Sequence, residues 1–252
     1  MTGLEREDFP IGFWSTNSMA STLSTAPLNA VYFPVFQNFF IWDDDVNLTE
    51  NPYLNDIEGL KRIWFDLWAM YQYYPMIFTS FWVEHKVWAL EPLGYHVDNV
   101  VLHCINALIL WRILSFLEVK GGWLAAAIFA IHPIQVESVA WITERKNLLS
   151  GFFYFSSLYF FLKFYSPDKP LNFNEDQNRK RPWAIYGISL FFFICALWSK
   201  TAVCTLPAVI LLICWWKQNC IRKKILLIMI PYFTLSFGFA ILTIQLESVN
   251  VG

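Results

Sequence analysis

The sequence predicts an all-α integral membrane protein, a polytopic bundle of about six or seven transmembrane helices with an amphipathic loop on the extracytoplasmic side. Of the 252 residues, 56% are hydrophobic and only 15% are charged, whereas soluble domains contain roughly 25% charged residues. Several apolar runs approach the roughly 20 residues that a helix needs to cross a bilayer. The loops between these runs also differ in their lysine and arginine content, as expected for opposite sides of a membrane.

The composition excludes two other classes of protein. The chain has 24 Phe, 13 Trp and 11 Tyr, which is the opposite of the composition of a disordered chain. Its net charge of −2 argues against a nucleic-acid partner, because phosphate binding needs a clustered basic surface.

The chain begins with residues 1–27, which mix charges with many Ser and Thr and lack the apolar core of a secretory signal. We expect a disordered or non-native tail there, followed by a transmembrane domain over residues 28–252. The first apolar run, residues 28–42, is the weakest candidate span because it is short and contains Pro34, Gln37 and Asn38. Stronger runs follow at residues 93–114, 122–142, 148–165, 183–199, 201–216 and 225–246.

The loops predict an orientation if successive runs cross in alternate directions. One set of loops is rich in lysine and arginine and is therefore expected to be cytoplasmic. Its cations are Arg112, Lys120, Lys163, Lys169, Arg179, Lys180, Arg181, Lys217, Arg222, Lys223 and Lys224. The other set has fewer cations and is expected to be extracytoplasmic. It comprises the long loop at residues 43–92, the segment 132–147 and the turn 199–201.

The extracytoplasmic loop at residues 43–92 opens with three consecutive carboxylates, Asp43, Asp44 and Asp45. Adjacent carboxylates repel one another unless a cation or hydrogen-bond donors compensate. A solvated helix end is one explanation. A calcium loop is excluded, because Leu48 stands where that loop needs glycine and Leu54 where it needs glutamate, and we expect no metal site.

The remainder of this loop is rich in aromatic residues. Residues 63–88 mix Trp and Tyr with a few charged side chains, a composition that suits the headgroup zone of a membrane. We expect short amphipathic helices on the outer membrane surface. An aromatic belt without a ligand is the alternative.

Polar residues inside one apolar run form a candidate functional face. His96, Asp98, Asn99, His103 and Asn106 include pairs at helical spacing. Polar groups at membrane depth usually face the bundle interior or a wet cavity. Hydrogen bonding between helices is the alternative explanation, in particular for His103 and Asn106.

The segment 132–147 carries a second candidate site. Pro133 interrupts the apolar run, which is tolerated where neighbours satisfy the freed backbone or where it lines a cavity. Arg145, Lys146 and Lys200 are cations on the predicted outer side, where they suit an anionic lipid phosphate. The alternative is pairing with nearby carboxylates, which are Glu137, Glu144 and Asp43 to Asp45.

These motifs together resemble a known family. The chain is similar to the membrane half of the O-mannosyltransferase-like proteins that carry tetratricopeptide repeats, within the GT-C class of glycosyltransferases, and the match is strongest to the bacterial branch. The resemblance covers about residues 30–250. It rests on four groups of residues: Trp42, Asp43 and Asp44 with Asn51 and Pro52; Pro92 to His96 with His103; His132, Pro133 and Glu137 with Glu144, Arg145 and Lys146; and Ser199 with Lys200.

The resemblance implies an inverting transfer of a sugar, mannose in the animal members, from a polyprenyl (dolichyl-type) phosphate to Ser or Thr hydroxyls of a protein on the extracytoplasmic side. It implies Asp43 or Asp44 as the general base and Arg145, with Lys146 and Lys200, as ligands of the donor phosphate. His132, Glu137, His96 and His103 would position the substrate. The implied partners are the lipid bilayer, a lipid-linked sugar and a protein acceptor, and whether a divalent metal takes part is left open.

The chain departs from this family in two respects. It shows no 34-residue repeat, and it stops at Gly252 soon after its last apolar run, so we expect a C-terminal truncation. Two alternatives therefore stay open: a non-catalytic remnant or scaffold, and a transporter of a lipid-linked or anionic solute. The expected location is a bacterial plasma membrane or, in a eukaryote, the endoplasmic reticulum membrane.

Overall fold

The computed structural model describes residues 31–70, 72–165 and 183–250, and all the regular structure in these ranges is helical. The predicted tail at residues 1–27 lies outside them. The short helices are η1 Phe33–Gln37, η2 Asp45–Thr49, η3 Pro52–Leu54, η4 Pro133–Gln135 and η5 Thr201–Thr205. The α-helices are α3 Ile57–Phe65, α4 Pro75–Trp88, α5 Pro92–Phe116, α6 Gly122–Ile131, α7 Val136–Ala140, α8 Arg145–Tyr165, α9 Trp183–Ser199, α10 Leu206–Gln218 and α11 Lys223–Asn250.

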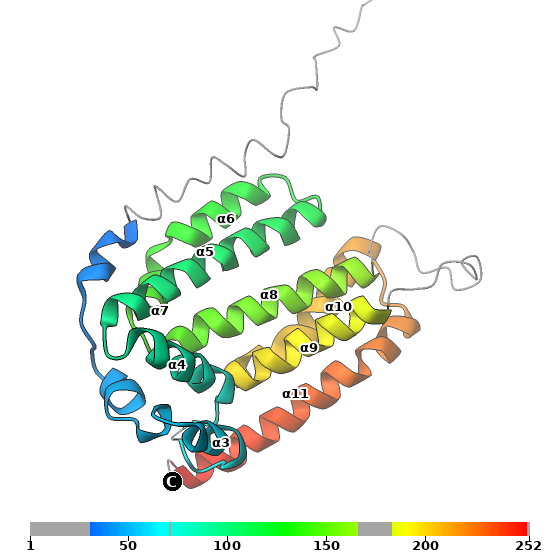
Figure 1. Ribbon diagram of the computed structural model, residues 1–252. Coiled ribbons are helices and arrows are strands. Elements are labelled where there is room, and N and C mark those ends of the chain that lie inside the picture. Colours follow the sequence, from blue (N-terminus) through cyan, green and yellow to red (C-terminus); the bar gives the residue numbers. More distant parts are fainter. Residues whose placement is uncertain (1–30, 71, 166–182, 251–252) are drawn as a thin grey trace, which may run out of the picture.

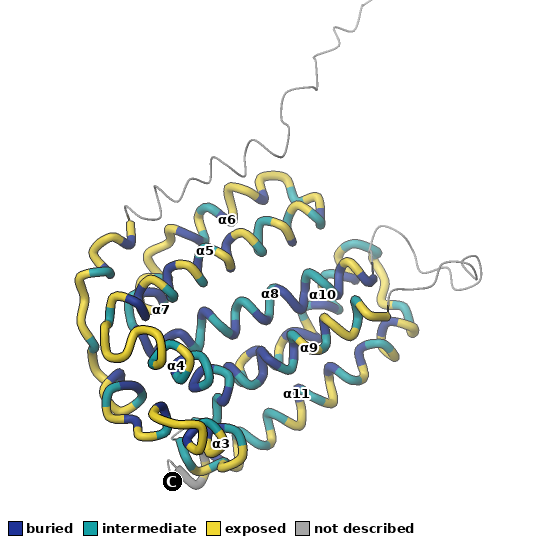
Figure 2. Tube along the Cα trace, in the orientation of Figure 1, coloured by how far each residue is buried: buried dark blue, intermediate teal, exposed yellow. Residues whose placement is uncertain are grey.

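Helix α8 forms the centre of the bundle (Figure 1). It packs against α5 on one side and α9 on the other, while α6 packs against α5, and α11 contacts α9 and α10. Lys163 is the single exposed residue of α8. Exposed residues instead lie along the outer helices, as Figure 2 shows for α5, α6 and α11.

The outer surface of α11 is apolar. Leu227, Phe237 and Ile244 are 66%, 71% and 66% exposed. An exposed apolar face of this length marks a surface that contacts lipid or protein rather than water, which agrees with the predicted membrane location.

Three helices are long and apolar enough to cross a membrane: Pro92–Phe116, Thr201–Gln218 and Lys223–Leu246. The pair Gly122–Ile131 and Pro133–Ala140, bent by 51°, makes a fourth if it counts as one span. The predicted six or seven spans are therefore not confirmed in the described part of the chain. Helix α9 has only 17 residues, and Tyr, Ser and Lys side chains lower the hydropathy of α8.

The weak first run does not form a continuous helix where it is described. Residues 31–42 comprise the end of a helical turn, the 3-10 helix η1 and an extended stretch. Pro34 lies in the first turn of η1, and Asn38 after it has an extended backbone. Residues 28–30 lie outside the described ranges.

The segments predicted to be extracytoplasmic all lie at one end of the bundle (Figure 1). This end carries the 43–92 loop, the α6–α8 connection and the turn before η5. The turn between α5 and α6, which contains Lys120, and the cation-rich turn between α10 and α11 lie at the opposite end. The two groups of loops that lysine and arginine content distinguishes are thus also separated in space, although the side of the membrane that each faces stays a prediction.

The 43–92 loop folds into short helices, two of which are α3 and α4. Helix α3 is capped by Asp56, the residue before its first turn, whose carboxylate accepts a hydrogen bond of 2.6 Å from the backbone N–H of Gly59. A side chain at position 59 would collide with the backbone oxygen of Tyr53, 2.2 Å from an ideal Cβ. Only glycine therefore allows α3 to pack this closely on η3.

The bend between α6 and α7 follows from Pro133, which has no N–H to continue the helix. The backbone N–H of Ile134 instead binds Nδ1 of His132 at 3.2 Å. The carbonyl of Ala130 accepts hydrogen bonds from Tyr32 Oη at 3.2 Å and from His103 Nε2 at 3.0 Å. Neighbouring side chains thus satisfy the backbone that the proline frees, as a break inside a membrane requires.

Candidate functional site

The site lies where the acidic loop meets the connection between α7 and α8. Asp44 is completely buried. One carboxylate oxygen accepts the backbone N–H of Ile41 at 3.0 Å, and the other accepts the backbone N–H of Thr143 at 2.9 Å. Burial raises the pKa of the Asp44 carboxyl, and these hydrogen bonds act in the opposite direction. Asp44 therefore anchors the loop to the bundle.

Asp43 has a different environment from its neighbour. Its side chain lines a pocket that is open to solvent. Its Oδ1 accepts a hydrogen bond of 2.8 Å from the hydroxyl of Thr143. The hydrogen bonds that the described residues make to this carboxylate all go to Oδ1, so Oδ2 is available to a ligand in the pocket.

The pocket has one polar wall and one apolar wall. The polar residues are Asp43, Asn47, Gln72, Thr143 and Lys146, and the remaining lining comes from Tyr74, Ile77, Phe78 and Phe81. The last four residues belong to α4 and the residue before it. A mixture of apolar side chains and a few convergent polar groups is typical of a small-molecule site.

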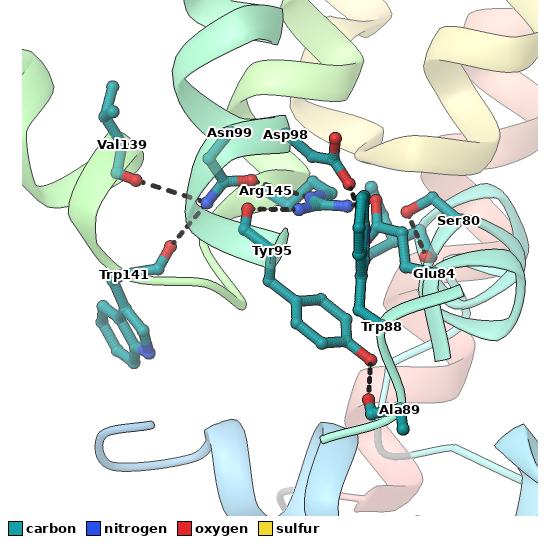
Figure 3. A network of polar contacts seen from close by, with 11 residues as sticks. Ser80, Glu84, Trp88, Ala89, Tyr95, Asp98, Asn99, Val139, Trp141 and Arg145 are labelled. Atoms are coloured by element: carbon teal, nitrogen blue, oxygen red, sulfur yellow. Dashed lines mark hydrogen bonds and ion pairs between the residues drawn. The ribbon is translucent and has the colours of Figure 1, made fainter. Parts of the chain in front are cut away.

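Arg145 is close in sequence to this pocket but is not among its lining residues, and its side chain points towards Tyr95, Asn99 and Glu84 (Figure 3). It is buried between α4 and α5, where the guanidinium forms an ion pair with Glu84. It also donates to Asn99 Oδ1 at 2.7 Å and to the carbonyl of Tyr95 at 2.9 Å. The face of the Phe81 ring lies 5.2 Å from it. These contacts occupy the guanidinium with protein partners.

Asn99 connects this network to α7. Its amide nitrogen lies 3.3 Å from the carbonyl oxygens of both Val139 and Trp141, as Figure 3 shows. These carbonyls lie at the C-terminal end of α7 and have no partner within that short helix. Asn99 and Arg145 together therefore hold α5, α7 and the start of α8 in one arrangement.

Lys146 projects into the pocket and forms an ion pair of 2.7 Å with Glu144. Pairing with a carboxylate was the alternative to phosphate binding, and Glu144 was among the predicted partners. The pair is partly exposed, since the side chains are 22% and 11% accessible. An incoming anion could therefore still reach the ammonium group.

Asn147 links Lys200 to the same cluster. Its side-chain oxygen accepts a hydrogen bond from Lys200 Nζ, and its amide nitrogen donates to Glu144 and to Ser138 Oγ. Burial lowers the pKa of Lys200, the charge of Glu144 raises it, and the charge of Lys146 lowers it further. The structure thus brings Lys146 and Lys200 together around Glu144 and Asn147.

Two of the predicted positioning residues lie outside the pocket lining. His132 and Glu137 are exposed at the junction of α6 and α7. His132 is used locally, because its Nδ1 accepts the backbone N–H of Ile134. Neither side chain is among the residues that line the pocket with Asp43.

The other two predicted positioning residues, His96 and His103, are buried inside the bundle at 1% and 0% exposure. His103 contacts α6 through the carbonyl of Ala130, and Asn106 donates to the carbonyl of Leu148 on α8 at 2.8 Å. For His103 and Asn106, the alternative of hydrogen bonding between helices is confirmed.

The sequence alone did not single out Thr143, Asn147 or Glu84. Thr143 and Asn147 are uncharged, and their importance comes from contacts with residues far away in the chain. Glu84 is an acidic residue within an aromatic-rich segment, and this unusual position was the one feature of the sequence that could have indicated a buried ion pair. Among the described residues, no three His, Cys, Asp or Glu side chains form a group that could hold a metal ion.

Comparison with known proteins identifies similar sequences. The chain is 30% identical over 138 residues to protein O-mannosyl-transferase F38B6.6 of Caenorhabditis elegans, an alignment that covers 49% of the chain and 20% of that protein. It is 27% identical over 160 residues to protein O-mannosyl-transferase TMTC3 of Mus musculus, covering 60% and 17%. It is 29% identical over 156 residues to the mouse TMTC2 enzyme, covering 58% and 19%.

The chain thus spans only about a fifth of the length of these curated relatives. No family model matches it, and no solved structure matches it. The relatives described here are animal proteins, and the predicted affinity to a bacterial branch stays a prediction. Over about 60% of its length, the chain is similar to protein O-mannosyl-transferases of the TMTC family.

Proposed function

We propose that this protein is a multi-pass, GT-C-like glycosyltransferase. It transfers a sugar, with mannose expected, from a polyprenyl phosphate to Ser or Thr hydroxyls of proteins on the extracytoplasmic side. The similarity to proteins named protein O-mannosyl-transferases supports the reaction class. The observation that carries the proposal is the pocket in which Asp43 and Lys146 face the same space.

Asp43 is the general base in this proposal, and Asp44 is its anchor. A base needs a free lone pair within hydrogen-bond reach of the proton it removes. Both oxygens of Asp44 accept backbone N–H groups, whereas Asp43 lines the pocket and uses only Oδ1 for Thr143. The two candidates that the sequence could not separate therefore receive different roles.

The reaction proceeds by one displacement at the anomeric carbon. Asp43 takes the proton of the acceptor hydroxyl, whose oxygen forms the new bond to the sugar. The bond between the anomeric carbon and the phosphate oxygen breaks, and the lipid phosphate leaves with the electron pair. Charge develops on the sugar ring as in other glycosyl transfers.

The leaving phosphate binds at Lys146 and Lys200 in this proposal. Both belong to the cluster around Glu144 and Asn147, and a preformed cationic site stabilises charge that develops in the transition state. Arg145 has a structural role in this proposal and does not bind the phosphate, because Glu84, Asn99 and Tyr95 already bind its guanidinium.

The charge distribution supports the proposed side of the membrane. Among the described loops, the α10–α11 turn is the richest in cations, with Lys217, Arg222, Lys223 and Lys224 in or beside it, and it lies at the bundle end opposite the pocket. Such loops are cytoplasmic in most membrane proteins, so the pocket opens on the extracytoplasmic side.

A donor panel tests the proposal directly. The purified protein is reconstituted in liposomes and incubated with polyprenyl-phosphate mannose, glucose or galactose and a Ser/Thr-rich acceptor peptide. Product formation from one donor, detected as a hexose mass increment on the peptide, is expected. Absence of product from every donor, with protein that unfolds cooperatively, would contradict the proposal.

A second candidate is a non-catalytic membrane protein that binds a lipid-linked sugar. The observation that favours it is the internal pairing of Arg145 with Glu84 and of Lys146 with Glu144, which leaves both cations neutralised without a ligand. Binding of the polyprenyl-phosphate sugar without any transfer in the same panel would support this candidate.

A further inference from the structure

We propose that Thr143 is a positioning residue for the transfer reaction and that its hydroxyl holds the carboxylate of Asp43 in the orientation that the base requires. This inference rests on the proposed function. Thr143 is only 5% exposed, lines the pocket, and donates its hydroxyl proton to Asp43 Oδ1 at 2.8 Å. It carries no charge and belongs to none of the groups that the proposed function uses.

Thr143 binds both aspartates with two different groups. Its hydroxyl contacts Asp43 and its backbone N–H contacts Asp44 at 2.9 Å. The two partners lie 100 and 99 residues earlier in the chain. One residue therefore joins the acidic loop to the start of α8, and it does so at the wall of the pocket.

The two contacts have separable consequences. The backbone N–H to Asp44 is present whatever the side chain at position 143, so it maintains the attachment of the loop. The hydroxyl donates its hydrogen bond to Asp43, and it also acts to lower the pKa of the Asp44 carboxyl. A carboxylate side chain rotates about its last bond unless a partner fixes it, and one hydrogen bond to Oδ1 directs Oδ2 to the pocket.

The hydroxyl also limits what Asp43 can bind. Because Oδ1 already accepts a proton from Thr143, the acceptor hydroxyl meets Oδ2. A base in one fixed orientation supports transfer better than one that samples several. Loss of the hydroxyl should therefore reduce the rate of the chemical step and leave donor binding, which uses the lysines, unchanged.

The test compares Thr143→Val with Thr143→Ser in the full-length protein. Valine keeps the shape but removes the hydroxyl, and serine keeps the hydroxyl. We expect valine to lower kcat about 10- to 100-fold, as for loss of a hydrogen bond to a charged group, with the KM for polyprenyl-phosphate mannose unchanged. Serine should restore kcat to within about threefold of the wild type.

Two further variants complete the design. Thr234→Val is the matched control, because the Thr234 hydroxyl donates only to the carbonyl of Ile230 within α11. Thr143→Ala provides a second hydroxyl-free side chain should the valine variant fold poorly, and it should show the same loss of kcat.

Wild-type kcat in Thr143→Val or Thr143→Ala would overturn the inference. A serine variant as impaired as the valine variant would overturn it too, because packing rather than the hydroxyl would then be responsible. Failure of the proposed function can be distinguished from failure of this inference, because the wild-type protein itself would then transfer no sugar.

Discussion

At the scale of the residue, two neighbouring aspartates differ because of what surrounds each of them. Asp44 is buried and its two oxygens accept backbone N–H groups. Asp43 lines the pocket and shares one oxygen with Thr143. In the proposed function, Asp44 therefore serves stability and Asp43 serves the chemistry.

The role of Asp44 predicts a loss of stability in Asp44→Asn. The asparagine amide would place N–H groups against the N–H of Ile41 or Thr143, so one buried donor would lose its acceptor. Such a loss costs about 1–3 kcal/mol. Thermal unfolding in detergent should show a lower midpoint than for the wild type. The matched control is Asp45→Asn at an exposed position, and equal midpoints for the two variants would contradict the anchoring role.

The environment of Lys200 predicts that the KM for the donor rises at alkaline pH. Burial lowers the pKa of this ammonium group, Glu144 opposes the shift and Lys146 adds to it. Lys200 therefore loses its proton below the ordinary lysine value of 10.5. The KM for the anionic donor should rise with pH in that range. In Lys200→Arg the charge persists and the rise should disappear; an unchanged profile in this variant would refute the assignment.

At the scale of the element, the start of α8 depends on a buried ion pair. Arg145 of α8 binds Glu84 of α4 and two groups of α5. Pairs of this kind are strongly destabilising when one partner is removed, because a buried charge is left without compensation. The position of the pocket wall therefore depends on three helices at once.

This pair predicts the behaviour of Arg145→Met. The single variant should lose about 3–5 kcal/mol of stability, and the double variant Arg145→Met with Glu84→Gln should recover part of it because no unpaired charge is left. Unfolding midpoints of both singles and the double measure the coupling. An Arg145→Met protein of wild-type stability with a raised donor KM would show instead that Arg145 binds the phosphate, as the sequence predicted.

The sequence patterns predicted some of the helices correctly, but they did not predict the contacts between distant segments. The long runs predicted α5 and α11, and Pro133 predicted the break between α6 and α7. The number of apolar runs did not predict which helices are long and apolar enough to cross a membrane. Helix α8 is an example, because its Tyr, Ser and Lys side chains lower its mean hydropathy. Nor could a pattern find that Glu84 pairs with Arg145 or that Thr143 binds Asp43, since these contacts exist only after distant segments pack together.

At the scale of the whole molecule, the site and the cation-rich turns occupy opposite ends of the bundle (Figure 1). The pocket is built from the 43–92 loop and the start of α8. At the other end, Cys220 is an exposed thiol between α10 and α11. This geometry makes the orientation measurable from outside the cell.

Labelling with a membrane-impermeant maleimide tests that orientation. Val46 is 68% exposed in η2 beside the site. In a Cys220→Ser background, Val46→Cys should react in intact cells, whereas the native Cys220 should react only after permeabilisation. The reverse pattern would place the pocket on the cytoplasmic side and contradict the proposed orientation.

The most direct test of the central claim is the rate of sugar transfer by Asp43→Asn beside Asp45→Asn. Both variants lose one carboxylate from the same acidic triplet, but only Asp43 lines the pocket. We predict that Asp43→Asn loses at least about 100-fold in kcat, the lower end of what a general base contributes, at unchanged unfolding midpoint, while Asp45→Asn transfers at the wild-type rate. Equal rates in the two variants would contradict the assignment of Asp43 as the base.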